Sequence, residues 1–464
     1  MTDGPLRSRV AAAVFLCFLH VGGAFAQTDA NVSLDEARAI ARQALASGNV
    51  QLARRIGRGL LKADPRDVDA YLILSAANAL AGNATLGRKA AAYAYRYSDR
   101  PDVRLYAAQE AARLSLAEQR PTLTQIWLRR AALNASNEAD QKRIAQDYQQ
   151  IRRANPWAFN IDLSARPSNN INNGSDSVYQ IIDGVPLIGI NDGASQALSG
   201  LIMQADAALQ YRLRGDARSR TSLGTRVVVQ QVHLSDSAKR TAPNVKNSDF
   251  ASTYADVSLS HAFQIGETRG NLAQISGAIG GLWYGGDLSY RLARIDGSRR
   301  WQINAATTLT LSGSIVQRDD ADASILDTTT YGLRAGVTRK LANGDDLTFT
   351  LGIQDAESDF TNRQSTTLSV QALYRVAEQV GPVKVSAGLV LSGSDFPSYR
   401  VGTIVVPGGR EDRSAYATVN LFFPDYDYAG FAPSLSIRAG KRTSNVSRFD
   451  STQLSIGLGI QSKF

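Results

Sequence analysis

From Trp157 onward, apolar and polar side chains alternate along the chain with a period of two, which is the spacing of a β-strand. The last segment shows this best, because Leu454, Ile456 and Leu458 share one face while Ser, Gly and Gln dominate the other. Strands with one apolar and one polar face are typical of transmembrane barrels, which turn the polar face toward a lumen. Fourteen such segments are predicted, at 157–167, 198–212, 217–233, 249–264, 270–285, 287–298, 301–317, 327–340, 345–356, 363–376, 381–393, 411–423, 431–442 and 449–464.

The connections between these segments fall into two classes by length. Even-numbered connections are short turns, such as 214–216 and 342–344, whereas most odd-numbered ones are long, notably 168–197, 234–248 and 394–410. An even number of strands brings both ends of a barrel to the same side, and the short turns of outer-membrane barrels face the periplasm. We therefore predict that the part of the chain before the first strand is periplasmic.

Before the barrel, residues 33–153 follow a helical spacing with almost no alternation. Gly48-Asn49 and Gly82-Asn83 each end a predicted helix, and the 34 residues that separate them are the tetratricopeptide period. A single helix of this kind cannot bury its apolar stripe alone, so stacked helix pairs supply the core and leave a concave face able to hold a polypeptide. The predicted helices that follow the first Gly-Asn pair include 50–62, 84–97, 102–118, 122–133 and 138–153.

Residues 1–26 have the pattern of a signal peptide, with a basic start, a short apolar run and a small-residue cleavage site at Ala24-Phe25-Ala26 before Gln27. The single cysteine, Cys17, lies in the apolar run, so the mature chain has none, and disulfides and thiolate metal sites are excluded. The fold predicted is α+β multidomain. An all-α tetratricopeptide-like solenoid spans 27–155, and a 14-stranded antiparallel transmembrane β-barrel spans 156–464.

Positive charge is concentrated in the helical part of the chain. Residues 27–155 hold 20 Lys and Arg against 13 Asp and Glu, whereas residues 156–464 are nearly neutral, with 29 against 28. A basic domain can bind nucleic acid, but these charges are spaced along helices of a segment predicted to be exported. We expect a solvated face or a surface for an acidic client, and no nucleic-acid partner.

Residues able to carry out chemistry are few, and no enzymatic activity or cofactor is predicted. His233 and His261 fall near opposite ends of their strands and so share no metal or acid–base site. The run from His233 to Asp236 holds the residue types of a hydrolase triad, but a triad is defined by geometry and not by adjacency. Asp319, Asp320 and Asp322 lack the ligand pattern of a calcium loop, and Gly277, Gly280 and Gly281 fall within a strand with no helix behind them to receive a phosphate.

The polar face of the predicted strands carries several arginines, which a soluble sandwich would not bury but a water-filled lumen tolerates. Aromatic residues such as Trp157 and Trp301 fall where the interface girdles of a membrane protein belong. The terminal Phe464 is the aromatic residue expected to signal to the barrel-assembly machinery. The candidate lumen residues are Arg166, Arg226, Arg334, Arg375 and Arg438.

At the domain junction the sequence resembles a known family. Pro156-Trp157 opens the barrel, and Pro167 is followed by Asn170-Ile171-Asn172 at the start of the long first connection. This pattern resembles the surface lipoprotein assembly modulators (Slam proteins), which pair a short tetratricopeptide domain with a 14-stranded barrel. The resemblance covers essentially the whole mature chain and implies a dedicated exporter of lipoproteins or soluble haem- or iron-acquisition proteins, with no catalytic residue.

Two functions follow as hypotheses. The first is an outer-membrane translocon that promotes export or surface display of specific client proteins. Its partners would be the client, outer-membrane lipid and the barrel-assembly machinery. The alternative is a polysaccharide exporter or a passive porin with a periplasmic repeat domain. Exporters of that kind usually carry many more repeats, which favours the first hypothesis, and the neighbouring genes would distinguish the two.

Overall fold

The computed structural model describes residues 32–462 apart from 184, 269, 427 and 429–430, and it describes only the backbone of 185–188 and 462. Two groups of predictions lie outside the described residues. One is the cleavage site at Ala24, Ala26 and Gln27, and the other is the terminal Phe464.

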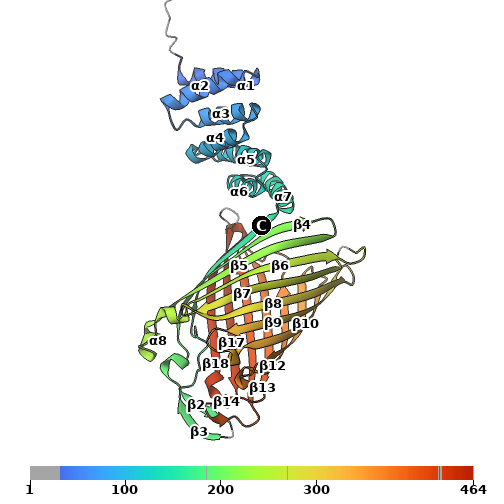
Figure 1. Cartoon of the computed structure of the whole chain (residues 1–464). Helices are drawn as coiled ribbons and strands as arrows, with labels where there is room; N and C mark the ends of the chain where they lie inside the picture. Colours follow the sequence, from blue (N-terminus) through green and yellow to red (C-terminus); the bar gives the residue numbers. More distant parts are fainter. Residues whose placement is uncertain (1–31, 184, 269, 427, 429–430, 463–464) are drawn as a thin grey trace, which may run out of the picture.

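Seven helices form the N-terminal part of the described chain and stack in one direction (Figure 1). Gly48 and Gly82 have φ of 77° and 73°, the left-handed conformation that ends a helix, and glycine reaches it without strain. The asparagine that follows each glycine caps the next helix, where its side chain accepts from a backbone N–H. The Gly-Asn repeat is therefore a helix-turn-helix signal. The helices are α1 (Leu34–Ala46), α2 (Val50–Ala63), α3 (Val68–Leu80), α4 (Ala84–Tyr97), α5 (Pro101–Ala117), α6 (Pro121–Ala132) and α7 (Glu138–Ala154).

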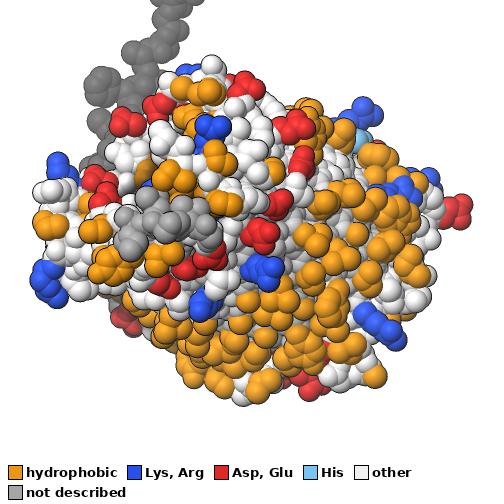
Figure 2. Space-filling view, turned by 90° about the horizontal axis from the view of Figure 1, so that it is seen from below, with side chains coloured by type: hydrophobic (Ala, Val, Ile, Leu, Met, Phe, Trp, Pro, Cys, Tyr) orange, Lys and Arg blue, Asp and Glu red, His pale blue; other side chains and the backbone are white. Residues whose placement is uncertain are grey.

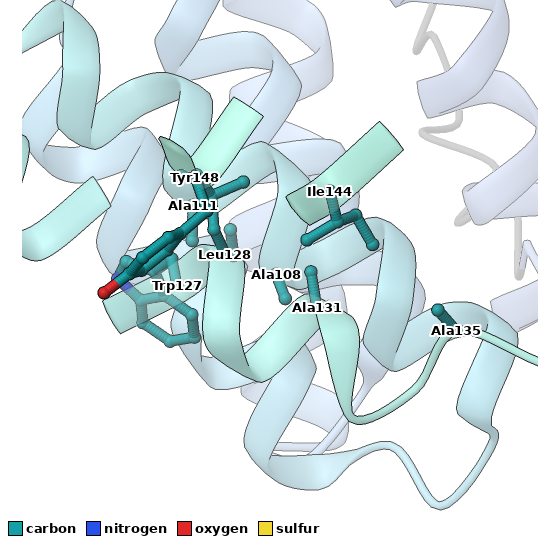
Figure 3. Packing of buried hydrophobic residues seen from close by; sticks show 10 residues of the cluster. Ala108, Ala111, Trp127, Leu128, Ala131, Ala135, Ile144 and Tyr148 are labelled. Atoms are coloured by element: carbon teal, nitrogen blue, oxygen red, sulfur yellow. The ribbon is translucent and has the colours of Figure 1, made fainter. Parts of the chain in front are cut away.

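Small residues let these helices approach closely. A Cβ added to Gly57 would lie 2.9 Å from Cγ of Leu74, and one added to Gly87 would lie 3.0 Å from the carbonyl oxygen of Ser75. Near the barrel, Trp127 of α6 fills the centre of an otherwise alanine-rich core shared by α5, α6 and α7 (Figure 3). Stacked pairs packed in this way are the tetratricopeptide-like solenoid that the sequence predicts.

The rest of the chain forms one closed antiparallel barrel of fourteen strands, in which β1 pairs with both β4 and β18. All fourteen predicted segments are strands of this barrel. One boundary was wrong: Trp301 belongs to β8, because the turn after it lies at 303–306. The barrel strands are β1 (Trp157–Ser168), β4 (Gly200–Gly215), β5 (Ser219–Leu234), β6 (Ser252–Gln264), β7 (Leu272–Tyr284), β8 (Asp287–Gln302), β9 (Thr307–Asp320), β10 (Thr328–Lys340), β11 (Asp346–Glu357), β12 (Ser365–Arg375), β13 (Lys384–Phe396), β16 (Arg410–Phe422), β17 (Phe431–Ser444) and β18 (Ser451–Ser462).

The outer wall of the barrel is apolar and exposed. Ile279 and Leu458 are 68% and 65% exposed, and Leu351 is similarly uncovered. Figure 2, which views the molecule from below relative to Figure 1, shows hydrophobic side chains gathered over much of the visible barrel wall. Such a belt is stable against lipid, and closure leaves no sheet edge to be exposed to it. This is the architecture of an outer-membrane β-barrel.

No helix among the described residues is both long and apolar enough to cross a membrane.

The two ends of the barrel differ. The end that carries the helical domain, called here the near end, has turns such as 216–218 and 341–345. The opposite, far end carries elements within its loops, and they lie away from the helices in Figure 1. One far connection is short, because Gly285 and Gly286 have φ of 65° and 102° and form a two-residue hairpin turn. The far-end elements include β2 (Tyr179–Ile182), β3 (Val185–Ile190), α8 (Asp236–Thr241), β14 (Arg400–Val401) and β15 (Ile404–Val405).

If the near end is periplasmic, protease added to intact cells should cut only the far-end loops, for example within 168–197. The helical domain should become accessible only after the outer membrane is permeabilised. With an epitope inserted after Ala46, immunoblotting would measure cleavage of the helical domain in intact and in permeabilised cells. Cleavage of the helices in sealed cells would invert the topology.

Candidate functional site

Hydrogen bonds fasten the helical domain to the near end of the barrel. Arg212 of β4 donates to the carbonyl oxygens of Arg153, Ala154 and Asn155, at 3.0, 2.8 and 2.9 Å. These carbonyls end α7, where a helix leaves its last acceptors unsatisfied and favours a cation. A single guanidinium thus caps the last helix and joins it to the barrel wall.

The junction residues add three hydrogen bonds and one ring contact. The side chain of Asn155 donates to Thr122 and Gln125 of α6, at 3.1 and 2.9 Å, and accepts from the backbone N–H of Trp157 at 3.0 Å. The ring of Trp157 packs on that of Tyr211, with centroids 4.5 Å apart. The Asn-Pro-Trp sequence therefore fixes the direction in which the chain leaves the helices and enters the first strand.

A large cleft lies beneath this junction. Its volume is about 1160 Å³. It is lined by the end of α7, the start of β1, the near-end parts of β4, β5, β6 and β7, and the turns between β4 and β5 and between β6 and β7. A second cavity of about 740 Å³ continues into the lumen and shares Arg220, Ala262 and Leu272 with the first. We call the two together the vestibule. Its charged residues are eight basic ones (Arg152, Arg153, Arg212, Arg218, Arg220, Arg300, Lys340 and Arg375) and three acidic ones (Asp216, Glu267 and Asp346).

The vestibule is therefore cationic and open to the side of the membrane on which the helices lie. A space of this size, lined by one sign of charge, raises the local concentration of an oppositely charged solute. Its excess of basic side chains would attract an anionic solute, such as an acidic polypeptide segment. The sequence pattern did not single it out, because its residues come from α7 and from several strands and turns that are distant in sequence.

Replacing Arg212 by alanine should loosen the coupling between the helical domain and the barrel. The last carbonyls of α7 would lose their donors, while the barrel would keep its strands. Spin labels on α7 and β5 should report a broader distance distribution in R212A than in the native protein. The neighbouring Arg214 is exposed, and its side chain forms no hydrogen bond within the described residues, so R214A is the matched control. An unchanged distribution in R212A would refute this role.

All five predicted lumen arginines lie on the inner face according to the strand register. Arg226 donates to Asp206 at 3.0 Å, Arg375 lines the vestibule, and Arg438 lies over the ring of Tyr416. Within the described residues, no carboxylate lies within ion-pair distance of Arg166, Arg334, Arg375 or Arg438. The lumen thus offers unneutralised positive charge along its wall.

The remaining residues of the junction motif act on the first far-end loop. Asn170 exchanges two hydrogen bonds with the backbone of Gly174, and Asn172 donates to the carbonyl oxygens of Ala194 and Gln196. Ile171 is 7% exposed in a small apolar core under α8. Pro167, which cannot donate to a ladder, lies in β1. These four residues therefore order the first far-end loop, and none of them lines the vestibule.

Several loops pack against one another at the far end. The guanidinium of Arg410 forms two hydrogen bonds to Asp412, and its carbon lies 3.9, 4.9 and 3.5 Å from the ring centroids of Phe396, Tyr399 and Phe449. An apolar cluster of Ile182, Val406 and Val446 joins three loops beside it. Figure 2 looks at this end.

The histidines and aspartates considered for a catalytic or metal site are far apart or already hydrogen-bonded to other side chains and backbone groups. His261 contacts Thr221 near one end of the barrel, and His233 contacts Asn247 near the other. Asp320 accepts from Arg363 and from the backbone N–H of Asp322. No three His, Cys, Asp or Glu residues within the described part of the chain are grouped to hold a metal ion.

No family model matches this sequence, and no curated protein matches it. Solved structures resemble its two parts separately. The chaperone SycD of the Yersinia enterocolitica type III secretion translocator is 18% identical over 26% of this chain and 88% of its own, with a TM-score of 0.24. OprB of Pseudomonas putida is 9% identical over 68% and 96%, with a TM-score of 0.38. A bacterial polysaccharide outer membrane secretin is 10% identical over 66% and 98%, with a TM-score of 0.34. At these values the likeness does not reach beyond general architecture.

The fold and its vestibule together define a class of protein. A closed transmembrane barrel with a polar, charged lumen is an outer-membrane barrel of the channel type. In this chain a helical solenoid is attached over one mouth and packed loops lie at the other.

Proposed function

We propose that this protein is an outer-membrane translocon that promotes the export or surface display of specific client proteins. The observation that carries the proposal is the attachment of the solenoid, by Arg212, directly above a cationic vestibule that leads into the lumen. In this proposal the helices lie in the periplasm, where they hold an acidic or partly unfolded client. The vestibule then receives the client from the helices.

The form of the barrel constrains the client. Barrels of about eight strands are filled by side chains, and those of 16–18 strands leave an aqueous channel, so fourteen strands leave a lumen too narrow for an ordinary folded domain. The client therefore enters the barrel unfolded or passes along its wall. The junction residues Pro156 to Asn172 resemble those of the Slam proteins, which makes surface lipoproteins and soluble haem- or iron-acquisition proteins the first clients to test.

The decisive experiment labels surface proteins on intact cells with a membrane-impermeant biotin reagent. Cells with and without this protein are compared by mass spectrometry. The proposal predicts one or a few proteins that are labelled only when this protein is present. A barrel that lacks residues 34–154 should insert but leave those proteins unlabelled. If the labelled set does not depend on this protein, the proposal fails.

A second candidate function is export of an anionic polysaccharide or passive diffusion of small solutes. The unpaired lumen arginines Arg166, Arg334 and Arg438 favour it, because they would attract an acidic polymer as readily as an acidic peptide. The packed far-end loops count against an open porin. Polysaccharide in the medium, or uptake of small sugars, that depends on this protein while the labelled proteins stay constant would support this candidate.

A further inference from the structure

Two lumen arginines flank β18 on the inner wall of the barrel. Arg166 belongs to β1 and Arg438 to β17, the two strands that pair with β18. A Cβ added to Gly457 of β18 would lie 3.6 Å from the Cβ of Arg166, and Ser455 is the register partner of Arg438. These two residues of β18 are small, and the positive charge of Arg438 acts on Arg166 across them.

The surroundings of this pair are polar but carry no negative charge. The other inward-facing residues next to the two arginines, along their own strands or across to the neighbouring ones, are all described and none is acidic. They are Ser164, Ser168, Ile202, Thr418, Ser436 and Gly440. By contrast, Arg226 forms an ion pair with Asp206 on the same inner wall. Two neighbouring positive charges repel each other, so the pair would gain from an anion that comes from solution.

Stacking on an aromatic ring holds Arg438 in place. Its guanidinium carbon lies 4.6 Å from the centroid of the Tyr416 ring, in a cation–π contact. Gly440 makes room for this ring, because a Cβ there would collide with the ring and lie 2.7 Å from the carbonyl oxygen of Ala415. Stacking uses the flat face of a guanidinium and leaves the N–H donors in its plane available to a ligand.

We propose that Arg166 and Arg438 form a binding site for a doubly charged oxyanion, such as phosphate or sulfate, on the wall of the lumen. Two positive charges match the charge of such an ion, and the N–H forks of guanidinium groups fit its oxygens. Arginine and lysine side chains serve the same purpose in pores that select anions. The inference concerns the lumen itself and holds whatever client or solute the barrel transports.

Equilibrium dialysis of the full protein in detergent against radiolabelled inorganic phosphate tests the site directly. The measurement is made at mildly alkaline pH, where phosphate is doubly charged, and at one ionic strength, so that the general attraction of the lumen is screened equally. R166A and R438A should each weaken binding by about tenfold or more, the effect of losing a hydrogen bond between charged groups.

R334A is the matched control for these two variants. Arg334 of β10 also faces the lumen, between the neutral residues Ser312 and Gly352 of the neighbouring strands, and it lies away from β18. Its removal takes the same charge from the lumen but leaves the pair intact, so R334A should bind phosphate like the native protein. An equal loss in R334A and R438A would overturn the site, because binding would then depend only on the total charge of the lumen.

Competing ions define the ligand. Unlabelled sulfate should compete as well as phosphate, whereas acetate carries one charge and should compete much more weakly. Glycerol 3-phosphate separates two sources of the phosphate group: strong competition supports a phosphate carried by a larger molecule, and weak competition supports the free ion. Acetate competing as well as phosphate, or no saturable binding of phosphate by the native protein, would overturn the proposal.

Heat-modifiable migration on gels shows whether each variant still forms a barrel. Should R438A fail this check, R438K serves in its place. Lysine keeps the charge but lacks the planar fork and the stacking surface of arginine, so R438K should still bind phosphate several-fold more weakly than the native protein. Native affinity in R438K and in R166A would overturn the site.

Discussion

Replacing Trp127 by alanine should lower the free energy of unfolding of the helical domain by about 3–5 kcal/mol, the usual cost of removing a buried tryptophan. Trp127 is 4% exposed and packs edge-on against Tyr95, with ring centroids 5.8 Å apart. Arg130 lies over its ring at 4.4 Å. Its neighbours are largely alanines, which are too small to fill the cavity that the truncation would leave (Figure 3).

Ile126 supplies the matched control for this substitution. It is adjacent in sequence but 40% exposed, so I126A should change stability by no more than about 0.5 kcal/mol. Chemical denaturation of the full chain in detergent, followed by far-ultraviolet circular dichroism at helical wavelengths, measures both. A W127A protein as stable as I126A would show that the α5–α7 core does not hold the domain together. Surface display of the client should also fall in W127A, because the helical domain above the vestibule would be less stably folded.

Replacing Arg410 by alanine should open the far end. Arg410 and Asp412 are 8% and 7% exposed, and removing one partner of a buried ion pair costs about 3–5 kcal/mol because the other charge is left uncompensated. The three rings around the guanidinium would also lose the cation that they share. We expect the loops to separate and the single-channel conductance in planar bilayers to rise several-fold.

Arg413 provides the control for this measurement. Its side chain is 82% exposed and belongs to the same strand, so R413A should leave the conductance at the native level. R410K is a stricter comparison, because lysine keeps the charge but cannot form the two parallel bonds to Asp412. Equal conductance in R410A and the native protein would mean that the aromatic cluster does not close the channel.

The local patterns were sufficient for most of the architecture. Alternation at period two gave all fourteen barrel strands, because each strand must present one face to lipid and the other to the lumen. The repeated Gly-Asn pair predicted two helix turns, since glycine at positive φ ends one helix and asparagine caps the next. The inner position of Arg226 and Arg438 followed from the same alternation, because strand geometry fixes the face of every second residue.

The boundary at Trp301 was misplaced because alternation weakens where a strand enters a turn. There the hydrogen bonds of Asn304 and Thr307, which no hydrophobic pattern records, define the end of the strand.

The tertiary structure alone decided which residues meet across long stretches of sequence. Arg212 caps α7 although it lies more than fifty residues away, and Arg410 is enclosed by rings from two distant segments, 396–399 and 449. Periodicity determines which face a side chain occupies, but the pairing of the first strand with the last depends on how the whole barrel closes.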